Sequence, residues 1–130
     1  MEIIEHNKQL IALIFRPQAN QNGSSFFTPP NLAMQVGFLH HKAGETIRPH
    51  AHSSKTMDLS GVCEIAIVQS GACEVQLYTS EGLLISTHDL AAGDAMVLLS
   101  GGHAFRMIED TDLYVIKQGP HTGPENKKYF

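Results

Sequence analysis

The chain has 130 residues and a mass of 14.2 kDa, the size of one domain. Apolar residues make up 42% of it and charged residues 17%, which excludes a disordered chain. Thirteen Asp and Glu against nine Lys and Arg give a net charge of −4, and no basic stripe is present. Nucleic acid is therefore not an expected partner.

The longest unbroken apolar run, Leu10–Phe15, is far shorter than the ~20 residues of a membrane span. Acidic residues, Glu2 and Glu5, precede it in place of a basic segment, so we expect neither a signal peptide nor a membrane partner. Cys63 and Cys73 lie in apolar segments and are interpreted as buried reduced thiols. Together these features predict a cytoplasmic protein.

In chain order, short apolar segments alternate with turn-forming residues, and none has the apolar period of a long helix. Nine segments are predicted to form strands: Gln9–Phe15, Ala33–His40, Glu45–His52, Val62–Gln69, Ala72–Tyr78, Leu83–His88, Ala95–Leu99, His103–Glu109 and Leu113–Gln118. This regular spacing predicts an all-β sandwich or barrel. Glu2, Glu5 and Lys8 are interpreted as part of a solvated arm, and Ser53–Gly61 as an irregular loop.

Histidine is the unusual feature of the composition, with eight residues, four of them between positions 40 and 52. His50 and His52 are two apart in a predicted strand, so their side chains are expected on one face, with Arg48 beside them. Glu64 begins an apolar strand, where a buried carboxylate is costly unless a cation accompanies it. With His103, which begins a later strand, these side chains would form a site for one divalent transition metal ion, such as Zn, Fe, Ni or Mn.

These residues resemble the metal-binding motifs of the cupins. Their first motif, G-x5-H-x-H-x(3,4)-E-x6-G, is similar to Gly44, His50-Ala51-His52, Glu64 and Gly71, with eleven residues between His52 and Glu64. The second motif, G-x5-P-x-G-x2-H-x3-N, is similar to the segment from Gly93 to His103, although one residue is missing before the histidine, Leu99 replaces the proline and Met107 the asparagine.

The resemblance covers about residues 33–118 and implies a small cupin-type β-barrel, a double-stranded β-helix or jelly-roll. It implies one cupin domain over residues 1–130, with the barrel at about 33–118, an N-terminal arm at 1–32 and a C-terminal tail at 119–130. It also implies that His50, His52, Glu64 and His103 bind the metal. Lys117-Gln118-Gly119-Pro120 is similar to a segment of small bacterial cupins often found near sugar-biosynthesis functions.

Other polar and aromatic residues are candidates for binding a small-molecule substrate. Arg48, Arg106 and Lys117 have the charge to bind an anion, although each is as readily an ordinary surface cation. His40 or Tyr78 would serve as a proton carrier if its side chain faced inward, and Phe105 would supply an apolar wall. The remaining histidines His6, His88 and His121 are interpreted as surface residues. The terminal Tyr129-Phe130 can pack on the body or on a partner.

Two classes of function are consistent with this site. One is a metal-dependent enzyme that acts on a small anionic or oxygen-rich molecule, either a sugar-derivative isomerase or epimerase or a dioxygenase. The alternative is a non-catalytic module that binds a small ligand or a metal, including a metal that only stabilises the fold. The strand Gln9–Phe15 is apolar on both faces, and small cupins commonly exchange such strands, so a homodimer is also expected.

Overall fold

The computed structural model describes residues 1–17, 23–56, 61, 63–120, 123 and 127–130. These residues form an all-β structure without a helix. Its strands are β1 (Glu2–His6), β2 (Gln9–Phe15), β3 (Gly23–Phe26), β4 (Gly37–His40), β5 (Glu64–Ser70), β6 (Ala72–Tyr78), β7 (Leu84–Ala91), β8 (Ala95–Leu98), β9 (Gly102–Met107) and β10 (Asp112–Lys117). They pair antiparallel in three open sheets, ordered β1-β2-β8-β5-β10, β7-β6-β9 and β3-β4.

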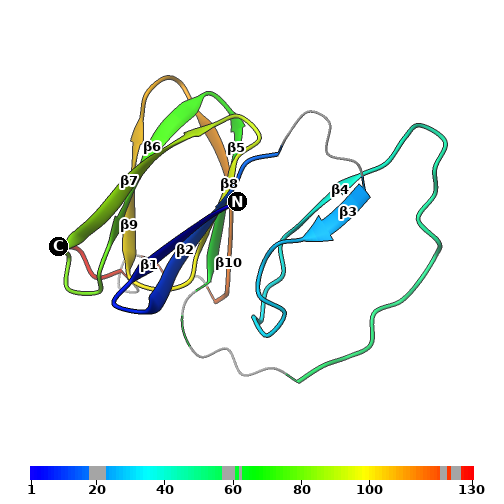
Figure 1. Cartoon of the computed structure of the whole chain (residues 1–130), viewed down its shortest axis with the longest axis horizontal. Coiled ribbons are helices and arrows are strands. Elements are labelled where there is room, and N and C mark those ends of the chain that lie inside the picture. The colour runs from blue at the N-terminus through cyan, green and yellow to red at the C-terminus, as the bar shows by residue number, and fades with distance from the viewer. Residues whose placement is uncertain (18–22, 57–60, 62, 121–122, 124–126) are drawn as a thin grey trace. The chain divides into compact units, whose positions relative to one another are not determined.

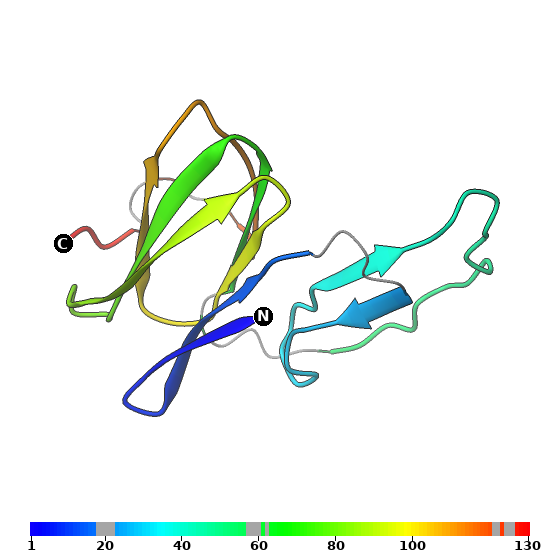
Figure 2. The same cartoon turned by 45° about the horizontal axis from the view of Figure 1, so that its top comes forward.

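The chain divides into two compact units, which are described separately. The first consists of Met1–Arg16 and Gly61–Phe130 and contains the five-stranded and three-stranded sheets (Figures 1 and 2). We call it the two-sheet unit. The second consists of Pro17–Ser60 and contains the β3-β4 sheet. Within the described residues, no helix has the length and apolarity needed to cross a membrane.

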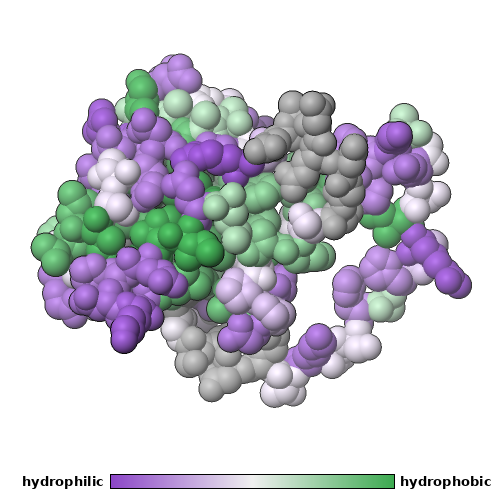
Figure 3. Space-filling view, in the orientation of Figure 1, coloured by the Kyte–Doolittle hydropathy of each residue, from purple (hydrophilic) through white to green (hydrophobic). Residues whose placement is uncertain are grey.

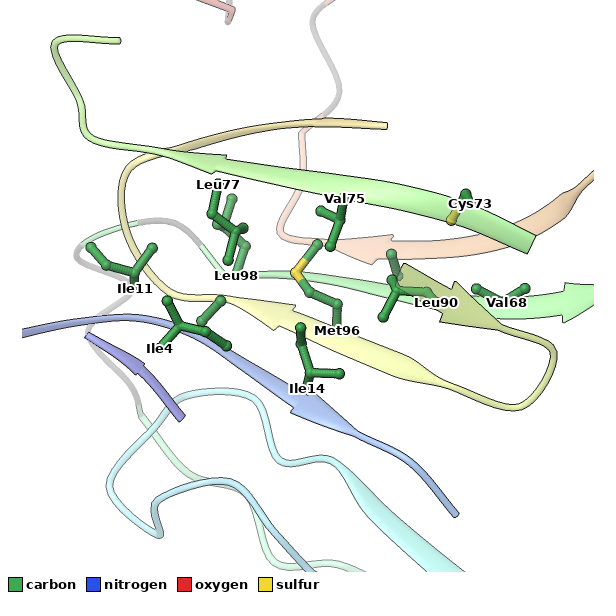
Figure 4. Close-up of a cluster of buried hydrophobic side chains, with 12 residues drawn as sticks. Ile4, Ile11, Ile14, Val68, Cys73, Val75, Leu77, Leu90, Met96 and Leu98 are labelled. Atoms are coloured by element: carbon green, nitrogen blue, oxygen red, sulfur yellow. The ribbon is translucent and has the colours of Figure 1, made fainter. Parts of the chain in front are cut away.

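The core of the two-sheet unit lies between its two sheets, whose apolar side chains point toward one another (Figure 4). Strand β6 alternates, with Cys73, Val75 and Leu77 fully buried and the residues between them partly exposed. This is the pattern of a strand with one face on the core. Strand β2, between β1 and β8, is instead buried at every position from Ile11 to Phe15. Cys63 and Cys73 are buried and not bridged.

Most expected strands are found within one to three residues of their predicted ends, but the segment containing the histidine pair is not a strand. Residues 45–52 have no regular structure, so the predicted strand Glu45–His52 is wrong. The expected strand Ala33–His40 is reduced to Gly37–His40, and β3 was not expected. Residues 45–52 contain Pro49, which cannot donate to a strand ladder, and no described strand pairs with them. Strand β4 extends over the four residues that pair with β3.

The expected N-terminal arm is also wrong at its beginning, because Glu2–His6 forms strand β1 and pairs with β2. The two residues that connect these strands, Asn7 and Lys8, have positive φ angles of 50° and 66°. Such a turn matches the twist of a two-stranded hairpin, and asparagine tolerates it well. Ile4 is then buried opposite Ala12, which is the apolar burial that ties β1 to the body.

A network of ion pairs joins the edge strand β1 to the residues around β7. Arg16 donates from Nη2 to Oε1 of Glu2 (2.9 Å) and from Nη1 to Oδ2 of Asp94 (2.8 Å). Asp94 is only 9% exposed and also accepts a hydrogen bond from the backbone of Ala91. Burial opposes ionisation of Glu2, but hydrogen bonding and charge from Arg16, with a contribution from His88, lower its pKa.

We predict that Arg16→Met lowers the free energy of unfolding by about 1–2 kcal/mol, because the buried carboxylate of Asp94 loses its charged partner. The stabilisation by Glu2 is complete above its ordinary pKa of 4.5 and is lost as the pH falls through its lower folded-state pKa. The variant should therefore also lose part of this acid dependence in urea unfolding. Arg106→Met is the matched control, since its pair with Glu74 is on the surface and should contribute less to stability. Equal effects of the two substitutions would contradict the assignment.

Candidate functional site

A pocket of about 530 Å³ lies in the two-sheet unit, beside the edge strands β9 and β10. Its wall includes Glu64 from β5, His103 from β9 and Lys117 from β10. The C-terminal segment 127–130 forms another part of the wall and brings Lys127 and Lys128 with it. Three of the nine Lys and Arg residues of an acidic chain thus line one pocket, and among its described lining residues Glu64 alone has an acidic side chain.

Glu64 and His103 reach this pocket because both lie on inward faces of their sheets. Glu64 is opposite the buried Leu98 on β8, and His103 is opposite the buried Leu77 on β6. Residues directly opposite in antiparallel strands share a face, so both side chains point between the sheets. There, Nε2 of His103 lies 3.0 Å from Oε1 of Glu64, with exposed side-chain fractions of 23% and 17%.

The charges around Glu64 favour its ionised form. The hydrogen bond from His103 has the largest effect, and it outweighs the opposing effect of burial, so the pKa of Glu64 is lowered. The charges of His103, Lys117 and Lys127 lower it further. Lys117 is directly opposite Glu64 in the β5–β10 register and therefore extends on the same face. The pocket consequently has an ionised carboxylate surrounded by basic groups.

His50 and His52 lie together in the other unit, on an exposed segment without regular structure. Their ring centroids are 5.0 Å apart, so the expected pairing of the two imidazoles is present although the strand is absent. Nδ1 of His50 is 2.8 Å from the carbonyl oxygen of Arg48. A nitrogen next to a carbonyl oxygen must carry the proton, which leaves Nε2 as the nitrogen with a free lone pair. Metal-binding histidines are oriented by the same kind of contact.

The structure therefore describes the four predicted metal ligands as two pairs, one in each unit. Within either unit, the described residues hold no group of three or more His, Cys, Asp or Glu able to bind one ion. The four-residue metal site stays a prediction. Two donors about 2.0–2.2 Å from one tetrahedral zinc ion are about 3.3–3.6 Å apart. Nε2 of His103 and Oε1 of Glu64, at 3.0 Å, would have to separate by a few tenths of an ångström to share such an ion.

The predicted substrate-binding residues have different surroundings. The ring of Phe105 contacts that of His103, with centroids 5.3 Å apart, and also packs against the core. The hydroxyl of Tyr78 donates to Oε1 of Gln76 at 2.7 Å, and both residues are on the β6 face opposite the core side chains. His40 ends β4 in the other unit and is exposed, as is Arg48.

Of the two roles open to Arg106, anion binding or an ordinary surface cation, the structure agrees with the second. Arg106 forms a surface ion pair with Glu74 at 2.8 Å, because its position on β9 faces away from the core. The interpretation of His88 is corrected. His88 was interpreted as a surface residue without partners. Its side chain is only 19% exposed and contacts Glu2 and Ser86, because β7 presents it on the inward face beside the edge strand β1. His121 lies outside the described residues, as does most of the predicted loop Ser53–Gly61.

The aromatic C-terminus packs on the two-sheet unit beside the pocket. The ring of Phe130 lies 5.4 Å from that of Tyr78, between centroids. It also occupies the space above two glycines, since a Cβ added to Gly102 would be 2.6 Å from Cζ of Phe130, and one added to Gly82 would be 2.8 Å from its Cγ. The two glycines thus form a seat that larger residues would fill. Packing of the terminal Tyr129-Phe130 on the body was one of two expected arrangements, but no local pattern pairs these glycines with this ring.

Comparisons of the chain with protein-family models, with curated proteins and with solved structures found no match. Its function is therefore inferred from its own residues and their geometry.

We predict that Phe130→Leu changes the amide resonances of Gly82 and Gly102 in a ¹H–¹⁵N correlation spectrum, because the aromatic ring current acts on the groups it covers. Gly93, whose added Cβ would meet no atom within 4 Å, is the internal control and should not shift. Unchanged Gly82 and Gly102 resonances would show that Phe130 does not occupy this seat.

Proposed function

We propose that this chain is a small metal-binding cupin that binds a small anionic or oxygen-rich molecule in the pocket of the two-sheet unit. The observation that carries the proposal is the contact between Glu64 and His103. The two residues are far apart in the sequence and come from different sheets, yet their side chains meet between those sheets in a pocket. They are also the carboxylate and the imidazole that the cupin motifs select.

The fold supports this proposal at a coarser level. Two open antiparallel sheets face each other across an apolar core, which is the arrangement from which a jelly-roll barrel is built. The structure requires glycine at position 71, the end of the first motif. Gly71 has a φ of +81°, and an added Cβ would collide with the carbonyl oxygen of Asp110. Closure of the sheets into a cupin-type barrel is part of what we propose.

The full metal site in this proposal contains Glu64 and His103 together with His50 and His52. One divalent ion, such as Zn, Fe, Ni or Mn, would supply Lewis-acid or oxygen-activating chemistry there. The contribution of the chain itself is electrostatic: Lys117, Lys127 and Lys128 attract an anionic group into the pocket. Phe105 restrains one side of the His103 ring and so orients its Nε2.

Isomerase or epimerase chemistry, dioxygenase chemistry and non-catalytic binding all use such a pocket. One observation favours binding without proton transfer. The Tyr78 hydroxyl, one of the expected proton carriers, donates to Gln76 on the β6 face opposite the core side chains. A non-catalytic module that binds a small ligand or a metal is therefore our second candidate function.

We predict that His50→Ala/His52→Ala abolishes tight binding of one metal per chain and leaves the two-sheet unit folded. Metal content is measured by plasma mass spectrometry on untagged protein purified without chelators, and folding by circular dichroism. His40→Ala/His41→Ala, a neighbouring pair in the same unit, is the matched control and should retain the metal. A full equivalent of metal in the His50/His52 variant would contradict the proposed site.

Binding of a small anion to the pocket is tested separately, with the same protein preparations. Oxalate is a small dianion that offers two oxygens to a metal, and its affinity is measured by calorimetry. Lys117→Met should weaken oxalate binding about tenfold, the loss of one charge-assisted contact, whereas Lys55→Met should not. Equal affinities of both variants and the unaltered protein would remove Lys117 from the site.

We also propose that the chain forms a homodimer, for a reason that differs from the one expected. The strand Gln9–Phe15 is already buried in the single chain. The edge strand β10, however, exposes Tyr114, Val115 and Ile116 at 47–58%, and among the described strands it pairs with β5 alone, so its other side can pair with a second copy. A hydrophobic area is also visible on the surface of the two-sheet unit in Figure 3. Light scattering at micromolar concentration should give twice 14.2 kDa; a monomer mass would refute the dimer.

A further inference from the structure

A second polar cluster lies at the edges of the two sheets that are opposite to the edges beside the pocket. Strands β1 and β7 are edge strands of the five-stranded and three-stranded sheets, and the pocket adjoins the opposite edges, β10 and β9. The cluster consists of Ser86, His88 and Glu2, and we call it the Ser86–His88–Glu2 relay. Leu77, which is fully buried, is opposite Ser86 on one side and His103 on the other, so it separates the two sites.

The contacts in the relay run in one direction. Nδ1 of His88 is 3.1 Å from Oε2 of Glu2, and Nε2 of His88 is 2.9 Å from the hydroxyl oxygen of Ser86. A carboxylate can only accept a hydrogen bond, so Nδ1 carries the proton of the neutral imidazole. Nε2 is then an acceptor, and the Ser86 hydroxyl donates to it. A serine, its base and a carboxylate that orients the base are thus joined by two consecutive hydrogen bonds.

The position of each member is fixed by its strand. Ser86 and His88 are two apart on β7 and share its inward face, opposite Leu77 and Val75. Glu2 is opposite Ile14, a core residue, and so faces the same space from β1. Arg16 holds Oε1 of Glu2 through two hydrogen bonds and leaves Oε2 for His88. Arg16 also donates a hydrogen bond to Asp94. This contact positions Arg16 and, through it, the Glu2 carboxylate that orients His88.

We propose that Ser86 is an activated nucleophile that accepts acyl groups from small esters, independently of any metal. In this step, Oγ of Ser86 forms a bond to the acyl carbon while its proton passes to Nε2 of His88. The ester C–O bond breaks, and the alcohol leaves with that proton. Water then attacks the acyl-serine, giving up a proton to His88, and releases the carboxylic acid and the free serine. The net reaction is ester and water to acid and alcohol.

Fluorophosphonate labelling in the presence of EDTA tests the proposal on the full chain. The expected product has a bond from Ser86 Oγ to phosphorus, with fluoride released, and peptide mass spectrometry locates it. Ser86→Ala should abolish the label, and His88→Ala should slow it about a hundredfold, the usual contribution of a general base. Glu2→Gln should slow labelling and change its pH profile, because an amide can hold His88 in the wrong tautomer.

Two other serines provide matched controls with hydrogen bonds but no histidine. Ser100 donates to the carbonyl of Leu10, and Ser70 donates to Asp112. Neither should be labelled, and Ser100→Ala should leave the rate unchanged. Hydrolysis of p-nitrophenyl acetate should follow the same order among the variants. Labelling of Ser70 or Ser100 at the same rate as Ser86, or no label on Ser86 in a protein shown to be folded, would overturn the proposal and assign the relay a structural role.

Discussion

An ionised carboxylate on the inward face of β5 is the constraint on which this structure depends. Its charge is compensated by His103 and Lys117, while Leu98, directly opposite it on β8, is part of the apolar core. His103 meets it at 3.0 Å from the other sheet, and Lys117 is opposite it in register. A lone carboxylate there would be costly. Compensation of its charge therefore requires both the register in which β10 pairs with β5 and the face that β9 presents to Glu64.

The two polar clusters described above lie away from the centre of the two-sheet unit. That centre is filled by side chains such as Leu77, Met96 and Val75, which are fully buried and leave no room for charge. Glu64, on the strand next to the edge, and His103, on an edge strand, lie beside the pocket. Glu2 and His88 lie on the edge strands β1 and β7, with the ion pairs of Arg16.

Strand positions in the two-sheet unit could be predicted because alternation and turn residues are clear there. Gln9–Phe15 and Ala72–Tyr78 coincide with β2 and β6. The facing of Glu64 was predictable from the cost of its charge, whereas the role of His88 was not, because it depends on β1, a strand whose turn requires positive φ at Lys8. The strand expected over residues 45–52 is wrong because alternating positions were taken as the faces of a strand. His50 and His52 lie together without regular structure. Which ring would occupy the Gly82 and Gly102 seat is a matter of tertiary packing that local pattern does not contain.

The metal site that we propose consists of His50, His52 and His103 together with Glu64. Zinc titration of the apoprotein, followed by long-range ¹H–¹⁵N correlation of the imidazole nitrogens, tests it most directly because each histidine reports separately. We expect the Nε2 chemical shifts of all three histidines to change in parallel and to reach their final values at about one equivalent of zinc. The chemical shifts of His6 and His88 should not change. A response of His50 and His52 without His103, or no response of any of them, would contradict it.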